Sequence, residues 1–187
     1  MNKKLRWITE TAMMLALLIT LQWVGSFIPE QLTKQLVTGS LVNCVLAVTV
    51  LVAGLSSGIT VALISPIMAF VLNIAPQILT VPAIMVGNTA FVLLLYFIAG
   101  KDSKKIFRQI AAWITAAVVK FGLLYGIVAG LICGVFAPAL LAAGSLKEPM
   151  LKALPATFSW PQLVTALIGG AVALLIVPVL RKALKKQ

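Results

Sequence analysis

The sequence predicts an all-α integral membrane protein with six transmembrane helices and both termini in the cytoplasm. The first observation is composition: 61 % of the 187 residues are hydrophobic and 10 % are charged, whereas about a quarter of the residues in soluble proteins are charged. The second is that the apolar residues gather in six segments, each near the roughly 20 residues that a membrane-spanning helix needs. The third is that basic residues lie at the segment ends. We therefore expect one six-helix membrane domain over residues 1–187.

The six predicted spans are separated by short polar or proline-containing connections. The first span follows a basic start and lacks the small-residue cleavage site of a signal peptide, so we expect it to be retained. A polar loop is expected at 29–35, a tight turn at 56–58, a basic loop at 101–108 and a long loop with room for a surface helix at 137–159. The spans are expected at residues 7–28, 36–55, 59–75, 78–100, 111–135 and 160–180.

The distribution of basic residues orients the predicted spans. Six spans place both termini and the 101–108 loop on one side of the membrane, and this side holds eleven Lys and Arg residues. Because basic residues are enriched in cytoplasmic loops, we expect both termini to be cytoplasmic. The same argument explains the net charge of +11 without a nucleic-acid partner. The three basic residues expected on the outer side are Lys34, Lys147 and Lys152.

Lys120 is the one charged residue within the apolar stretch 111–135. At ~1.5 Å per residue it lies roughly 18 Å along the helix from Arg108, too deep to reach the basic end easily. A lysine near the bilayer centre costs roughly 2.5 to 3.5 kcal/mol, so it usually faces a bundle interior or a wet cavity. Two interpretations follow: Lys120 is either an interhelical donor to backbone carbonyls or the floor of a polar binding site.

Side-chain amides gather in the middle and outer half of the predicted membrane domain, whereas the inner halves of the spans contain hydroxyl groups but no amide. A channel needs a polar path through both halves, and a proton pump needs intramembrane carboxylates. The pattern instead predicts an outward-facing pocket closed at its inner end, although each amide alone also suits interhelical hydrogen bonding. The aromatic rings of the predicted site are expected to stack on a polar solute. The predicted substrate-binding residues are Gln22, Trp23, Asn43, Asn73, Gln77, Asn88, Lys120, Tyr125 and Gln162.

The residue types that most catalytic sites need are scarce. The chain has no histidine and four acidic residues, so we expect no enzyme activity, no metal site and no cofactor. Cys44 and Cys133 match no metal-binding spacing, and the sequence leaves a disulfide between them open. No G-x-x-x-x-G-K-[ST] motif is present to cradle a nucleotide phosphate. A one-sided pocket without an energy source therefore needs a partner to move its contents.

A small-residue face on the first span suits such a partner. Ala12 and Ala16 are four residues apart, so they share a helix face and permit close approach of another helix. With the chain's size, its six spans and the closing stretch PQLVTALIGGAVALLIVPVL, this face resembles the substrate-binding S components of energy-coupling factor (ECF) vitamin transporters. The resemblance covers the whole chain. It implies a bacterial plasma-membrane subunit that docks through these alanines to a transmembrane coupling protein with two cytoplasmic ATPases. It also implies that the subunit tilts over in the membrane to carry its ligand inward.

The ligand is less constrained than the class of protein. Lys120 suggests an anionic group, most simply a carboxylate, and pantothenate fits because its amide and hydroxyls suit Asn43, Asn73 and Asn88. The same groups also suit cobalamin or a precursor, niacin, a pyridoxine-type ring or a pyrimidine. Outside this family, the main alternative is a self-sufficient small-molecule transporter or channel. A polar lining that continued into the cytoplasmic half would favour that alternative.

Overall fold

The computed structural model describes residues 2–72, 77–100 and 106–184, and every regular element in these ranges is helical. Most of the predicted basic loop at 101–108 falls outside the described residues. The elements are α1 (Lys3–Ser26), α2 (Gln31–Val52), α3 (Leu55–Val71), η1 (Ile78–Thr80), α4 (Val81–Ala99), α5 (Ile106–Tyr125), η2 (Gly126–Val135), α6 (Ala137–Ala142), α7 (Glu148–Thr157) and α8 (Trp160–Leu184).

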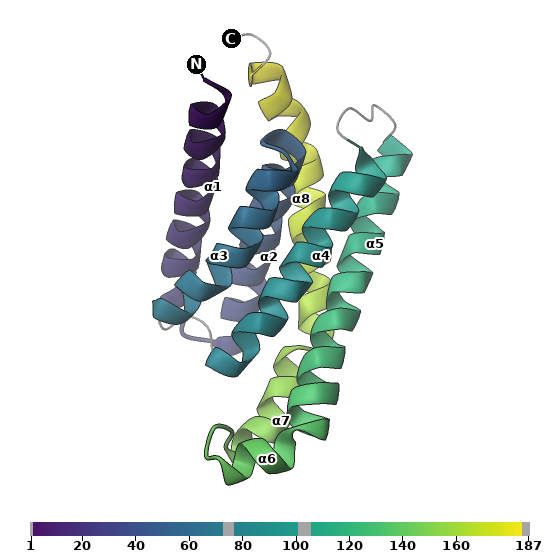
Figure 1. Ribbon diagram of the computed structural model, residues 1–187. Helices are drawn as coiled ribbons and strands as arrows, with labels where there is room; N and C mark the ends of the chain where they lie inside the picture. The colour runs from purple at the N-terminus through teal and green to yellow at the C-terminus, as the bar shows by residue number, and fades with distance from the viewer. Residues whose placement is uncertain (1, 73–76, 101–105, 185–187) are drawn as a thin grey trace.

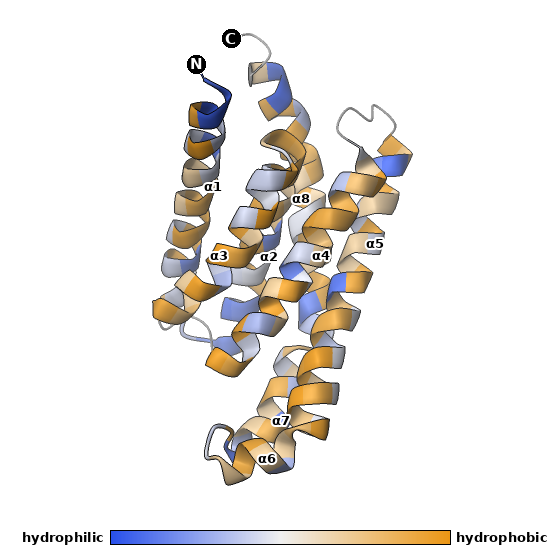
Figure 2. Ribbon diagram, in the orientation of Figure 1, coloured by the Kyte–Doolittle hydropathy of each residue, from blue (hydrophilic) through white to orange (hydrophobic). Residues whose placement is uncertain are grey.

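The long helices run side by side as a bundle, with the N-terminus and the C-terminus at the same end (Figure 1). The π-helix η2 continues α5 beyond the bundle, where α6 and α7 pack against it. Figure 2 shows hydrophilic residues at the end that carries both termini and around the start of α2. Much of the apolar surface is exposed, as expected of helices that face lipid.

Five of the described helical segments are long and apolar enough to cross a membrane. The predicted span at 59–75 corresponds to α3, which is apolar but has 17 residues. At ~1.5 Å per residue this helix is roughly 26 Å long, somewhat short of the ~30 Å hydrocarbon core. The structure therefore bears out an all-helical membrane protein, and the count of six spans stays a prediction.

Two predicted connections are wrong in position. The turn expected at 56–58 lies in the first turn of α3, and the chain breaks instead at Gly54, whose φ of 98° favours glycine. The polar loop expected at 29–35 is mostly helix, because the carboxylate of Glu30 caps α2 by accepting from the backbone N–H of Leu32 and Thr33. The long loop at 137–159 holds two short helices, α6 and α7.

Glycine allows α2 and α8 to pack closely in the middle of the bundle. A Cβ atom added at Gly169 of α8 would lie 2.7 Å from the Cβ of Asn43 and 2.8 Å from the backbone nitrogen of Cys44. Across the same interface, a Cβ atom at Gly39 of α2 would lie 2.9 Å from Thr165. Small residues thus bring the backbones together, as is common between membrane helices. This contact fixes the side of α2 that faces the bundle interior.

Candidate functional site

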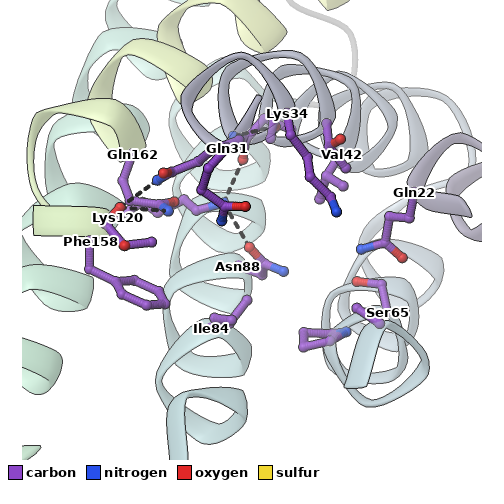
Figure 3. Close-up of a pocket in the computed structure, with 17 residues that line it drawn as sticks. Gln22, Gln31, Lys34, Val42, Ser65, Ile84, Asn88, Lys120, Phe158 and Gln162 are labelled. Carbon is purple, nitrogen blue, oxygen red and sulfur yellow. Dashed lines mark hydrogen bonds between the residues drawn. The ribbon is translucent and has the colours of Figure 1, made fainter. Parts of the chain in front are cut away.

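A pocket of about 170 Å³ opens in the half of the bundle away from the two termini. Its lining comes from helices α1 to α5, α7 and α8, and from Phe158, which follows α7 (Figure 3). Helix α2 contributes most, because its lining residues recur every three or four positions and therefore share one helix face. The lining residues from α2 are Gln31, Lys34, Gln35, Thr38, Gly39, Val42 and Asn43. The other helices supply Gln22, Ser65, Pro66, Ala69, Ile84, Asn88, Lys120, Thr157, Phe158 and Gln162.

Lys120 joins three helices at one side of this pocket. Its ammonium group donates to the side-chain oxygen of Asn43 at 2.5 Å and to that of Asn88 at 2.7 Å. It also lies 5.4 Å from the centre of the Phe91 ring, within the range of a cation–π contact. The residue is 3 % exposed. Its partners are thus side-chain amides from α2 and α4, and both had been predicted for the site.

The lysine decides which way the two amides point. A lysine ammonium can only donate, so both amides must turn their oxygens toward it. The amino group of Asn43 then donates to the backbone oxygen of Gly39 at 2.9 Å and to the hydroxyl of Thr165 at 3.3 Å. The amino group of Asn88 is buried and has no partner among the described residues. Asn88 therefore keeps a free donor beside the pocket.

Four helices each bring one unpartnered polar atom to the pocket lining. In native structures the large majority of buried polar groups have a hydrogen-bond partner. A polar solute in the pocket would supply the partners that the described chain does not. The four atoms are Gln22 Oε1, Thr38 Oγ1, Ser65 Oγ and Asn88 Nδ2.

The charged side chains of the pocket lining are both cations, Lys34 and Lys120. Among the described residues of the lining there is no carboxylate. Within the described part of the chain the one ion pair joins Arg6 and Glu10 on the surface of α1, at the opposite end of that helix. The pocket therefore carries positive charge that no described acid neutralises. This charge would favour an anionic solute.

Five of the predicted site residues line the pocket together: Gln22, Asn43, Asn88, Lys120 and Gln162. Others lie elsewhere. Trp23 and Tyr125 are 53 % and 44 % exposed and are absent from the lining. Gln77 donates to the sulfur of Met150 at 2.6 Å, also outside the pocket lining, and Asn73 is outside the described residues. Phe158 provides the aromatic surface in their place.

The remaining predicted positions have simple outcomes. Ala12 and Ala16 are both exposed on α1, so their face is open in the isolated chain. Cys44 and Cys133 are free thiols. Among the described residues no group of three or more His, Cys, Asp or Glu could hold a metal ion.

The sequence analysis did not place Lys34 at the site, because residues 29–35 were expected to form a loop. Taking these residues as the first turns of a helix would have placed Lys34 on the same helix as Asn43, and both residues line the pocket.

Helices of this length and hydropathy are typical of a multi-pass integral membrane protein. Its family follows from sequence comparison. A family model described as "ECF transporter, substrate-specific component" matches residues 6–181, and the chain belongs to this family. No curated protein and no solved structure matched in the other two comparisons. The resemblance inferred from the sequence is thereby confirmed, and the protein is a substrate-specific transporter subunit.

Proposed function

We propose that this protein captures a small acidic vitamin outside the cell for an ECF importer. The observation that carries the proposal is the pocket itself, where four unpartnered polar atoms meet two lysines and no described carboxylate. Burying a polar group without a partner costs free energy. A polar anionic solute recovers that cost for Gln22, Ser65 and Asn88, and it also balances the charge of the lysines.

Pantothenate is the vitamin that we propose first. It has a carboxylate, an amide and hydroxyl groups, which suit the lysines, the side-chain amides and the hydroxyls of Thr38 and Ser65. Niacin, a pyridoxine-type ring or a pyrimidine would use fewer of these groups. The pocket volume of about 170 Å³ favours these small molecules over cobalamin, which is several times larger.

The transport cycle that we propose needs partners. The chain acts as one six-span membrane domain with cytoplasmic termini, so the pocket opens outward. It docks to a transmembrane coupling protein through Ala12 and Ala16, and it tilts over to carry the ligand inward while two cytoplasmic ATPases hydrolyse ATP. Exposure of both alanines on α1 supports this docking face. The family of the chain supports the partners.

Reconstitution in lipid vesicles tests the proposal. Vesicles that hold this protein alone should bind pantothenate without concentrating it. Addition of the coupling protein and the ATPases, with ATP on the ATPase side, should start concentrative uptake of radiolabelled pantothenate. Accumulation by the lone protein under a proton or sodium gradient would instead indicate a self-sufficient transporter. Mass spectrometry of small molecules released from the purified protein identifies the ligand independently.

A further inference from the structure

Of the two lysines that line the pocket, Lys34 is the one without a hydrogen-bond or ion-pair partner among the described residues. It lies in the first turns of α2, is half-buried and lines the pocket. Its ammonium group makes no hydrogen bond or ion pair with any described residue. Figure 3 shows the side chain of Lys34 directed toward the space between Asn88 and Gln22. A flexible side chain with three donors is therefore free to meet a solute.

The nearest carboxylate along the chain is already occupied. Glu30 lies one helical turn before Lys34 but accepts hydrogen bonds from the backbone N–H of Leu32 and Thr33. Hydrogen bonds from Thr33 and then Leu32 lower the pKa of the Glu30 carboxyl, so the group is ionised and serves as the helix cap. No ion pair joins Glu30 to Lys34. The charge of Lys34 thus remains available.

Lys120, in contrast, is engaged by the protein. Two of its three donors go to the oxygens of Asn43 and Asn88, and the Phe91 ring lies on a further side. Lys120 thus has one donor left for a ligand, whereas Lys34 has all three.

From these contacts we infer that Lys34 binds the carboxylate of the ligand, whereas Lys120 is a positioning residue that turns the amino group of Asn88 into the pocket. This inference rests on the proposed function. The levels of Lys34 and Asn43 along α2 differ by roughly 14 Å at ~1.5 Å per residue. An elongated molecule therefore lies with its acid at Lys34 and a hydrogen-bond acceptor at Asn88.

The test compares an acid with its matched alcohol. Pantothenate and panthenol differ only where the carboxylate is replaced by a hydroxymethyl group. Calorimetry should show that Lys34→Met lowers the affinity for pantothenate by roughly 10- to 100-fold, the range for a hydrogen bond to a charged group. The affinity for panthenol should change little. Lys152→Met is the matched control, because Lys152 is exposed on α7 and does not line the pocket.

Lys120 requires a different readout. Lys120→Met should lower the affinities for pantothenate and panthenol by the same factor, since the lysine does not touch the carboxylate. The double variant Lys120→Met/Asn88→Leu should bind no more weakly than Asn88→Leu alone, because Lys120 acts through Asn88. A selective loss of pantothenate binding in Lys120→Met would overturn the inference, and so would additive losses in the double variant.

The outcomes separate this inference from the proposed function. If the wild type binds pantothenate and Lys34→Met binds it as well as Lys152→Met does, the role of Lys34 is wrong and the acidic ligand stands. If mass spectrometry identifies another acid, the same comparison is made with that acid and its neutral amide or alcohol. If the wild type retains only neutral molecules and binds no acid, both fail.

Discussion

Asn88 turns its side-chain oxygen to the ammonium group of Lys120, 2.7 Å away, and leaves its amino group unpartnered beside the pocket. Asn43 makes the same contact with the same lysine, but its amino group donates hydrogen bonds to Gly39 and Thr165. One buried cation thus orients two amides, and it leaves a donor free on only one of them. This difference makes the two asparagines separable by experiment.

Asn88→Asp should weaken ligand binding without unfolding the protein. The aspartate keeps an oxygen for Lys120 but replaces the free donor with an acceptor, which repels the acceptor of the ligand. We expect a loss of roughly 10- to 100-fold in affinity, measured by calorimetry. Asn43→Asp is the control, because it places the same charge beside the same lysine. It should lower the Tm more and the affinity less, and equal affinity losses would contradict the assigned orientation.

Lys120→Met should lower the thermal stability of the ligand-free protein. The substitution leaves the oxygens of Asn43 and Asn88 buried without their donor, at about 1 to 3 kcal/mol for each unsatisfied group. A chain of this length loses roughly 2 to 4 °C in Tm per kcal/mol. Thermal unfolding in detergent, with Lys152→Met in parallel, measures the effect. An unchanged Tm would show that the three-helix contact contributes little to stability.

Gly169→Ala should destabilise the bundle, and Gly122→Ala should not. The added Cβ at Gly169 meets Asn43 and the backbone of Cys44, so α2 and α8 must move apart. Overpacking of this kind costs about 1 to 3 kcal/mol. At Gly122 of α5 the Cβ enters open space, and alanine favours a helix by up to ~1 kcal/mol over glycine. Parallel thermal unfolding of the two variants checks this, and similar Tm values would argue against the close contact.

Replacing both Ala12 and Ala16 with tryptophan should abolish uptake and preserve ligand binding. Both positions are exposed and neither lines the pocket, so the added bulk should affect only a helix that docks on this face. Uptake is measured in vesicles that contain the coupling protein and the ATPases, and binding by calorimetry on the isolated protein. Leu17→Trp is the control, because Leu17 is exposed on another face of α1. Comparable loss of binding and uptake would refute the docking face.

The sequence predicts the long helices because a run of apolar residues is visible without any tertiary contact. It predicts the start of α2 poorly because the first turn of that helix is polar, and the cap at Glu30 compensates for it. The depths expected in the membrane place Gln22, Asn43, Asn88, Lys120 and Gln162 at similar levels, and in the structure these five residues line one pocket.

The depth of a residue in the membrane does not determine which side of its helix the side chain faces. Trp23 follows Gln22 by one residue, about 100° around the helix, and therefore faces outward while Gln22 is buried. Tyr125 is five residues after Lys120, about 140° away around α5, and it too is exposed. The face of each helix that lines the pocket is decided by how that helix packs against its neighbours, as α2 does against α8.

Seven of the 17 residues that line the pocket stand on one face of α2, from Gln31 to Asn43. One face of a single helix thus supplies a large share of the groups that a solute in the pocket would contact. Substitutions along it can change ligand preference while the opposite helices, and the alanine face of α1, stay as they are. The residues that contact the ligand and the proposed docking face are therefore separate parts of the chain.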